Sequence, residues 1–551
     1  MAIIVIGLDG ADWQIIEPLI NSGKLPAIQR LIDSGCRGIL HSTIPPNSPP
    51  AWASMITGVN PGKHGIFDFT GIDENYRKVP LRMTSKLGVA PLWRILNANG
   101  ITTGIINLPI LYPAEPVDGY MVCGMVTPWN ARVFTYPERL SQAIGNPKEN
   151  WIIGEGLGSG KNLEVFFLEI RNKTRRQAEF VIEMSKEFKT TFLMAVFDGT
   201  DKMQHYFWKF WDPTHPRHDP QASQVLKYAL DTYYMDLDTY VGRIIDRLGE
   251  SDVFVVSDHG FMRQSQDFYI ENWLLEEGYL QRAYPTVNAP NQVIRKTAIR
   301  IYQSAAFQKL KSIAKQPEIL HRLRQHVKAA INNRNAARDD IDWPKTRAYF
   351  AGVSSQAIKL NLKGREKFGI VHEGEDYTNL VAELKSRLKQ YRDPASGLPV
   401  IREVYHRDEI YHGPRVMDAP DLVAISENGY LLQEGFPERL LNPSMQYGLD
   451  RSGSHRSEGI FIGSGPNIRA KSAALNAQII DIMPTILYLS GLAIPNYVDG
   501  DVLTAAIQEE YLRRHPIERT DQSIDVQPGA GEMSPEEKAS LEEHLRALGY
   551  F

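Results

Sequence analysis

Three apolar segments of the sequence end in aspartate, a residue type that binds metal ions and transfers protons. The segments are "IIVIGLDG", "TFLMAVFDG" and "DVFVVSDHG", and they end in Asp9, in the Asp198/Asp201 pair and in Asp258. In parallel sheets covered by helices, ligands bind at the carboxyl ends of the strands. We therefore expect these acidic sites to meet at one edge of a sheet.

Histidines accompany two of the acidic sites. Asp201 and His205 are four residues apart in "FDGTDKMQHYFW", which places both on one face of a helix, within reach of one ion. Asp258 and His259 precede a glycine in "VVSDHG", and His455 lies in the loop "GSHRSEG". Singly, these residues are also typical of helix caps, surfaces or loops. Together they predict an Asp/His site suited to zinc or manganese.

The stretch "NSPPAWASMITGVNPGKHG" contains a candidate nucleophile. Ser48 precedes two prolines and a short helical pattern, so it is either a helix cap or a nucleophile. Two metal ions can activate a nucleophile and hold a phosphoryl oxygen between them. We expect a helix to begin just after Ser48 and to offer its N-terminal amides to a phosphoryl group.

The ordered motifs resemble those of the alkaline phosphatase superfamily, and within it the type I phosphodiesterases and nucleotide pyrophosphatases. The motifs are "GLDG", Ser followed by "PPAWASMITGVNPGKHGI", Asp-x-x-x-His, "SDHG" and a late Gly-x-His, within residues 1–260 and 345–505. The resemblance implies that Ser48, nine residues before Thr57, is the nucleophile and forms a phosphoseryl intermediate. It also implies two divalent metal ions, zinc in first place and manganese as the alternative. Their ligands would be Asp201, His205 and His455 for one ion, and Asp9, Asp258 and His259 for the other.

The activity that the resemblance implies is hydrolysis of phosphodiester or pyrophosphate-type bonds in a small phosphorylated substrate. Two alternatives stay open: a phosphomonoesterase or cofactor-independent phosphomutase at the same site, and a non-catalytic binding module. Phe69 stands where diesterases of the family carry a phosphate-binding asparagine, so other donors must hold the phosphate. Lys63 and His64 are nearby candidates. A sulfatase is disfavoured, because the frame from Ser48 reads S-P-P-A-W and lacks the required arginine.

Short β-rich segments alternate with helical patterns along the chain, and "TTGIINLP", "PDLVAI" and "GIFIGSG" are further expected strands. This alternation predicts an α/β fold with a mostly parallel sheet between helices. The resemblance makes it an alkaline-phosphatase-like core with a helical insertion. We expect the first part of the core in residues 1–261, a basic helical insertion or cap in 262–345, the second part of the core in 346–505, and a linker with a C-terminal helix in 506–551.

Two segments outside the resemblance have patterns of their own. Between Asn291 and Arg338 there are eleven Lys or Arg and one acidic residue, Glu318. Such a basic face is more typical of solvated surface than of a clamp for a polyanion or an anionic membrane. Near the end of the chain, "SPEE" from Ser534 predicts a helix start with a capping box. Its leucines at 541, 545 and 548 predict an apolar stripe for docking.

The overall composition is typical of a globular protein without a general affinity for nucleic acid. The net charge is −4, with 43% hydrophobic and 23% charged residues. Only Cys36 and Cys123 occur, which disfavours a disulfide scaffold or a thiolate zinc site. No apolar run approaches the roughly 20 residues that span a bilayer, and the first segment is typical of a buried strand rather than a signal peptide. We expect a cytoplasmic protein, and the oligomeric state is not predicted.

Overall fold

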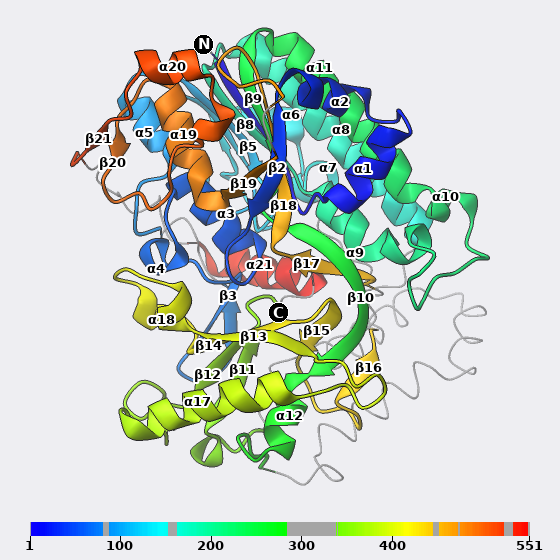
Figure 1. Cartoon of the computed structure of the whole chain (residues 1–551), viewed down its shortest axis with the longest axis vertical. Helices are drawn as coiled ribbons and strands as arrows, with labels where there is room; N and C mark the ends of the chain where they lie inside the picture. The colour runs from blue at the N-terminus through cyan, green and yellow to red at the C-terminus, as the bar shows by residue number, and fades with distance from the viewer. Residues whose placement is uncertain are drawn as a thin grey trace.

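The three strands that end in aspartate are neighbours at the centre of one sheet in the computed structural model of the chain (Figure 1). Strand β1 (Ala2–Leu8) pairs in parallel with β8 (Phe192–Phe197) on one side and with β9 (Ser251–Val256) on the other. All three are buried along nearly their whole length. Central parallel strands are covered on both faces, and this explains their continuous apolar sequences.

The structure describes residues 2–80, 87–152, 162–283, 338, 340–444, 451–471, 474–522 and 533–548. Most of the basic insertion expected between residues 262 and 345 lies outside these residues, as does part of the linker before the C-terminal helix. The expected divisions of the chain at residues 261, 345 and 505 therefore stay predictions. Strand β10 (Gly260–Tyr269) runs across the first of them.

The central sheet has nine strands in the order β19-β2-β18-β9-β1-β8-β5-β6-β7. Its other strands are β5 (Thr103–Leu108), β6 (Gly119–Cys123), β7 (Thr135–Tyr136), β2 (Cys36–His41), β18 (Glu458–Ser464) and β19 (Leu475–Gln478). Strand β18 is antiparallel to both of its neighbours, β7 is antiparallel to β6, and the remaining pairs are parallel. The predicted mostly parallel α/β fold is confirmed.

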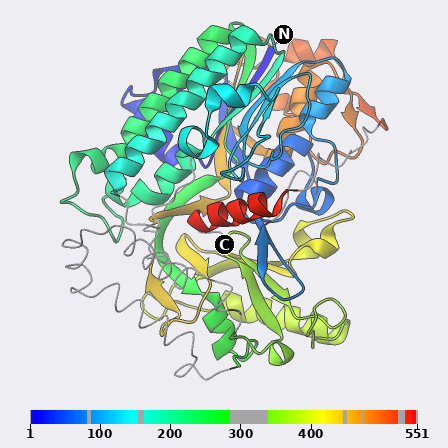
Figure 2. The same cartoon turned by 180° about the vertical axis from the view of Figure 1, so that it is seen from behind.

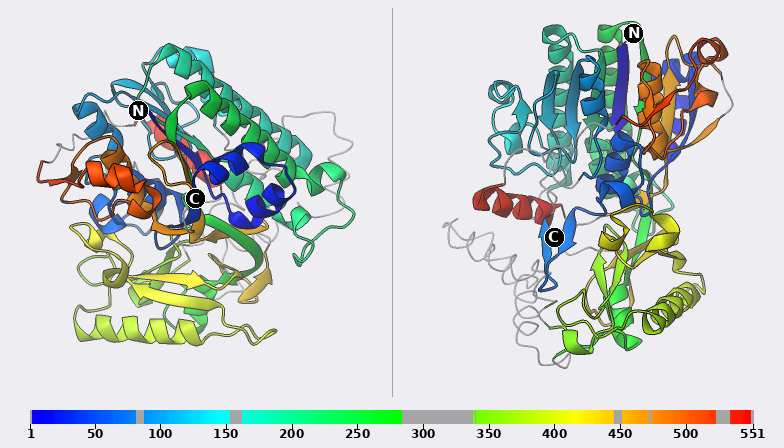
Figure 3. Two further views of the ribbon diagram at one scale, coloured as in Figure 1. Left: turned by 45° about the horizontal axis from the view of Figure 1, so that its top comes forward. Right: turned by 90° about the vertical axis from the view of Figure 1, so that its left-hand side faces the viewer.

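Helices cover both faces of this sheet (Figure 3). One layer contains α1 (Trp13–Asn21), α2 (Pro26–Ser34), α8 (Leu163–Glu187) and α11 (Ala229–Leu248). The other contains α3 (Ser48–Thr57), α5 (Leu92–Ala98) and α19 (Ile482–Leu489). Among the described residues, no helix combines the length and the apolar character that a membrane crossing requires.

A smaller body with its own apolar core lies below the sheet in Figure 1 and comprises residues 268–280 and 340–441. It contains an antiparallel sheet of β11 (Ala348–Gly352), β12 (Ala357–Leu360), β14 (Leu422–Ser426) and β13 (Ile401–His406), with α17 (Glu375–Gln390) packed against it. The segment "PDLVAI" forms β14 and so does not extend the parallel sheet as expected. A short buried apolar run shows that a strand is covered but not which sheet it joins.

Two further elements connect the core and the smaller body. A hairpin of β3 (Thr70–Ile72) and β4 (Lys78–Pro80) reaches from the core into the smaller body, where Tyr76 stacks on Trp343 with ring centroids 3.8 Å apart. Helix α21 (Pro535–Ala547) lies across the middle of the molecule in Figure 2 and contacts β4. Its side chains at 541, 545 and 548 are buried.

Candidate active site and metal centre

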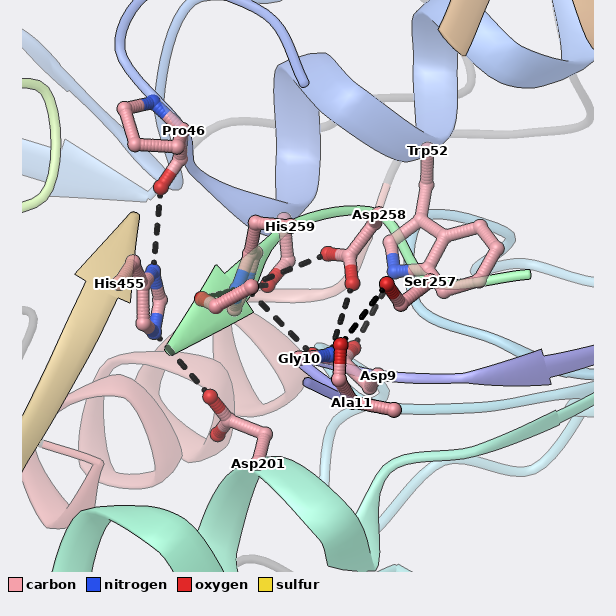
Figure 4. Close-up of polar contacts among 12 residues, drawn as sticks. Asp9, Gly10, Ala11, Pro46, Trp52, Asp201, Ser257, Asp258, His259 and His455 are labelled. Carbon is pink, nitrogen blue, oxygen red and sulfur yellow. Dashed lines mark hydrogen bonds and ion pairs between the residues drawn. The ribbon is translucent and has the colours of Figure 1, made fainter. Parts of the chain in front are cut away.

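The carboxyl ends of β1, β8 and β9 bring the predicted aspartates and histidines together (Figure 4). Asp9 directly follows β1, and Asp258 and His259 follow β9. Asp201 lies in the first turn of α9 (Gly199–Trp211), which begins just after β8. His455 comes from β17 (Gly453–Arg456), because this strand pairs with β10 and sets His455 opposite Phe261.

Asp201, His205 and His455 form the first group of candidate ligands. Oδ1 of Asp201 lies 3.2 Å from Nε2 of His205 and 3.1 Å from Nε2 of His455. The two imidazole Nε2 atoms are 3.1 Å apart. Three ligand atoms that face one point at these distances could hold a metal ion.

A second group lies beside the first. Ligand atoms of Asp9, Asp201 and His259 all lie within 4.8 Å of one another, so Asp201 belongs to both groups. Nε2 of His259 is 3.7 Å from Oδ1 of Asp9 and 3.4 Å from Oδ2 of Asp258. The structure thus brings all six predicted ligand residues into one buried cluster.

Each aspartate of the cluster has one carboxylate oxygen that accepts a hydrogen bond from the chain. The donors are Trp52 Nε1 to Asp9 Oδ2 at 3.1 Å, the Gly10 amide to Asp258 Oδ1 at 3.0 Å, and Lys202 Nζ to Asp201 Oδ2 at 2.8 Å. The other oxygens of Asp9 and Asp258 are buried and have no hydrogen-bond partner among the described residues. Buried anionic oxygens without a donor are costly. This donor set therefore fits divalent cations.

The three histidines are oriented by the backbone. Nδ1 of His205 donates to the carbonyl of Gly453 at 2.7 Å, and Nδ1 of His455 donates to that of Pro46 at 3.1 Å. His259 donates to its neighbour Gly260 at 3.1 Å. Since a carbonyl can only accept, Nδ1 carries the proton in each ring, and Nε2 presents its lone pair to the cluster.

The electrostatics of the cluster also favour cation binding. Burial, together with the charges of Asp258 and Asp201, raises the pKa of Asp9 well above its usual value. Burial raises the pKa of Asp258 to about 7, and the hydrogen bond from Gly10 opposes the rise. Burial lowers the pKa of His205 to about 4, so this imidazole is neutral at neutral pH. Neutral imidazoles beside crowded carboxylates are ligands that a dication stabilises.

Ser48 lies at the edge of this cluster. It is buried, and its Oγ is 3.3 Å from Nε2 of His259. Helix α3 begins at Ser48 itself, with Asn47 as its N-cap, and not just after Ser48 as expected. Pro49 and Pro50 have no amide hydrogen, so the expected row of helix amides for a phosphoryl group is not available. Ser48 is also not the capping residue of α3.

The phosphate-binding candidates near position 69 have other partners. Phe69 is buried. Lys63 Nζ donates to the carbonyl of Tyr497 at 2.8 Å and pairs with Asp499. His64 is buried, with Nε2 3.0 Å from Oγ of Ser54, and burial lowers its pKa to about 3. Neither Lys63 nor His64 directs a free donor toward the cluster.

Sequence reasoning missed the residues that hold the aspartates. Trp52 lies four residues after Ser48, so the helical spacing already placed both on one face of α3. A tryptophan within a helical pattern is nevertheless more often a core residue, and the sequence does not indicate which group accepts the hydrogen bond of its indole N–H. Lys202 directly follows Asp201 in the sequence. Because adjacent residues on a helix point in different directions, this spacing did not predict their contact.

Comparison with known proteins shows the family of the chain. A model of the family described as type I phosphodiesterase/nucleotide pyrophosphatase matches residues 3–446. The chain belongs to this family. The predicted family and enzyme class are therefore confirmed, and the protein is a phosphodiesterase- or nucleotide pyrophosphatase-like hydrolase. No curated protein gives a significant match to the chain.

Several solved structures are similar to this member of the family. Phosphonoacetate hydrolase from Sinorhizobium meliloti 1021, in complex with phosphonoformate, is 15% identical with a TM-score of 0.48, over 87% of this chain and 93% of that chain. Human ectonucleotide pyrophosphatase/phosphodiesterase 5 is 12% identical with a TM-score of 0.46, over 94% and 99% of the two chains. An inactive form of the murine protein in complex with AMP is 12% identical with a TM-score of 0.47, over 90% and 96%.

Proposed function

We propose that the protein hydrolyses phosphodiester or pyrophosphate-type bonds of small phosphorylated molecules, with Ser48 as nucleophile and two divalent metal ions as cofactors. The observation that carries the proposal is the position of Ser48. Its hydroxyl lies against His259, within a cluster in which one buried carboxylate oxygen each of Asp9 and Asp258 lacks a donor among the described residues. A serine hydroxyl is a weak nucleophile at neutral pH and needs such an environment to react.

The six ligand residues divide into two sets in this proposal. Asp201, His205 and His455 hold one ion, and Asp9, Asp258 and His259 hold the other. Zinc is the first choice and manganese the alternative, because carboxylate and imidazole ligands suit both. When bound, such ions acidify a coordinated hydroxyl and stabilise charge on the phosphoryl oxygens.

The chain's own residues then carry out a two-step displacement. Oγ of Ser48 gives its proton to solvent and forms a bond to phosphorus in line with the leaving oxygen. The bond from phosphorus to that oxygen breaks, and the released group takes up a proton. A water molecule then attacks the phosphoseryl group, breaks its bond to Oγ, and returns Ser48 with its proton.

A second reaction at the same site is the competing proposal. Phe69 is buried, and the resemblance to the family places it where diesterases carry a phosphate-binding asparagine. This replacement favours a substrate whose phosphate is held differently. Phosphomonoester hydrolysis or phosphomutase chemistry therefore remains the alternative function.

The deciding experiment compares bis(p-nitrophenyl) phosphate with p-nitrophenyl phosphate, using protein reconstituted with zinc or with manganese. We expect the diester to be preferred and Ser48→Ala to abolish its turnover without changing metal content. Ser54→Ala is the matched control, since this serine lies on the same helix but contacts His64. A marked monoester preference would select the alternative function, and an active Ser48→Ala protein would exclude this nucleophile.

A further inference from the structure

A cleft of about 620 Å³ opens between the core and the smaller body. One wall is the segment 65–72, which leads from the core into the β3–β4 hairpin. The other walls come from β11 and β12 and from the segment 415–420. In Figure 1, β3 runs from the core down toward β14 and β12 of the smaller body.

One wall of the cleft is tied to the nucleophile segment. Asp68 lines the cleft and accepts a hydrogen bond at its Oδ1 from Nδ2 of Asn47, across 3.3 Å. Asn47 immediately precedes Ser48 in the chain. This hydrogen bond joins the wall of the cleft to the segment that carries Ser48.

Lys359 is the cation of the cleft with the weakest partner. It lies on β12, its side chain is 23% exposed, and within the described part of the chain its ion pair is with Oε1 of Glu366 at 3.7 Å. That distance is too long for a hydrogen bond. Burial and then the charge of Arg365 lower the pKa of Lys359. An anion in the cleft would stabilise this ammonium group.

The nearby carboxylates are occupied by other donors. Glu366 accepts from Nε of Arg365 at 2.7 Å, and Asp421 accepts from both terminal nitrogens of Arg365 at 2.6 and 2.8 Å. Asp421 also accepts from Arg407 at 3.2 Å. These two carboxylates are thus held by Arg365 and Arg407, and within the described part of the chain Lys359 has only the long pair to Glu366.

The remaining lining of the cleft could contact an apolar part of the molecule that bears the anionic group. Met417 at the rim is 63% exposed. Phe67 lines the same cleft, and its ring packs edge-on against Tyr411. Arg415 at the rim is paired with Asp418 at 3.4 Å, so it adds little net charge.

A neighbouring cleft of about 670 Å³ shares Ile72, Lys359 and Arg365 with the first. It is lined by three acidic residues, Asp73, Glu74 and Glu366, and by three basic ones, Lys359, Arg365 and Lys367. The first cleft has three basic residues and only two acidic ones, Asp68 and Asp418, so it is the better site for an anion.

We propose that the cleft beside Asp68 binds an anionic group on the part of the substrate that is not displaced, with Lys359 as its partner. This proposal rests on the proposed function and narrows it. The substrates would be diesters or anhydrides in which the group that stays bonded to phosphorus is largely apolar or aromatic. This group would also carry a negative charge of its own. The ammonium of Lys359 would then select for that charge.

The test uses two p-nitrophenyl phosphodiesters with the same leaving group. The second alcohol is 3-carboxyphenol in one ester and 3-carbamoylphenol in the other, so the esters differ by one charge. We expect the wild-type protein to favour the carboxylate ester in kcat/KM by on the order of tenfold. Lys359→Met should remove this preference by raising KM for the carboxylate ester alone.

Lys385→Met is the matched control. Lys385 also belongs to the smaller body, is 25% exposed, and pairs with Glu409 on α18 (Arg407–Ile410), so it does not line the cleft. This variant should keep the wild-type preference. An unchanged preference in Lys359→Met, or none in the wild-type protein, overturns the proposal.

A binding measurement separates this proposal from the proposed function. Titration calorimetry with the Ser48→Ala protein needs no turnover, and it should show tighter binding of the carboxylate ester than of the carboxamide ester. The difference should vanish in the Ser48→Ala, Lys359→Met double variant. If neither ester is hydrolysed but this difference is found, the proposed reaction is wrong and the anion site stands. If hydrolysis occurs and the difference is absent, the anion site is wrong.

Discussion

The indole N–H of Trp52 donates a hydrogen bond to Oδ2 of Asp9 across 3.1 Å and so joins helix α3 to strand β1. Because α3 also begins with Ser48, one helix carries both the proposed nucleophile and the donor that orients a proposed metal ligand. The tryptophan ring lies over Gly7 in β1, where a Cβ atom would approach it to 2.6 Å. The packing of α3 on β1 therefore sets the distance between Ser48 and the cluster.

Replacing this donor should weaken metal binding. Trp52→Phe keeps most of the buried ring but leaves Asp9 Oδ2 without its hydrogen bond. Loss of a partner that orients a metal ligand typically costs about 10- to 100-fold in metal affinity. We expect a loss of this size, measured by competition with a chromogenic zinc chelator.

A matched substitution distinguishes the loss of Asp9 orientation from the loss of tryptophan packing. Trp93 is also a buried tryptophan whose indole N–H bonds a carboxylate, that of Glu115, in a different part of the core. Trp93→Phe should lower stability without changing zinc affinity. Equal losses of affinity in the two variants would show that Trp52 does not orient Asp9.

The position of the Asp/His cluster could be predicted from the sequence because the ends of the strands can be recognised there. Asp9 and Asp258 each follow a continuous apolar run, and parallel central strands place their carboxyl ends at one edge. The helical spacing of Asp201 and His205 needed no knowledge of the fold. His455 was placed by the resemblance alone, since a single histidine in a loop has no pattern of its own.

Features that depend on tertiary packing could not be predicted in this way. Helix α3 begins one residue earlier than expected, and its prolines at 49 and 50 remove amides that the expectation counted on. The donor role of Trp52 depends on which face of α3 meets β1. The membership of β14 in the smaller body depends on strand pairing between distant segments, which short apolar runs do not encode.

Removal of one histidine should remove one metal ion. Nε2 of His455 lies 3.1 Å from both Oδ1 of Asp201 and Nε2 of His205, so His455→Ala leaves that group with two ligands. We expect elemental analysis to find one equivalent of zinc fewer and activity to be mostly lost. His218→Ala is the control, because His218 likewise contacts a backbone carbonyl through Nδ1, that of Lys209. Full metal content in His455→Ala would contradict the assignment.

The Asp68 carboxylate should prove important for both stability and turnover. Its Oδ1 accepts from the Phe69 amide at 2.7 Å, from Asn47 and from Ser354 of the smaller body. Asp68→Ala leaves these buried donors unpaired, which we expect to lower the free energy of unfolding by about 2–4 kcal/mol. Since Asn47 precedes Ser48, kcat should fall while metal content is unchanged.

A conservative variant separates the loss of hydrogen bonds at Asp68 from the loss of charge. Asp68→Asn retains one carbonyl oxygen for the three donors. It should therefore recover most of the stability and of kcat that Asp68→Ala loses. If Asp68→Ala unfolds at the wild-type urea concentration and turns over normally, the link from Asp68 to the nucleophile segment has no functional consequence.

Docking of helix α21 should depend on pH through His544. The side chain is buried, its Nδ1 donates to the carbonyl of Thr127 at 3.1 Å, and its ring stacks on Trp129 at 5.1 Å. Burial lowers its pKa to about 4; the hydrogen bond to Thr127 opposes this decrease, and the charges of Lys202, Lys173 and Lys148 add to it.

The sign of this effect follows from proton binding. The folded pKa of His544 lies below the unfolded value of about 6.5, so the unfolded chain takes up its proton first as the pH falls. The stabilising contribution is complete above pH 6.5 and is lost between about pH 6.5 and 4. At pH 5 the loss should be about 2 kcal/mol.

His544→Gln keeps a donor for Thr127 but cannot gain charge, so it should lose less stability than the wild-type protein between pH 7.5 and pH 5 in urea unfolding. Parallel losses in both proteins would show that the pKa of His544 is the same in the folded and unfolded states.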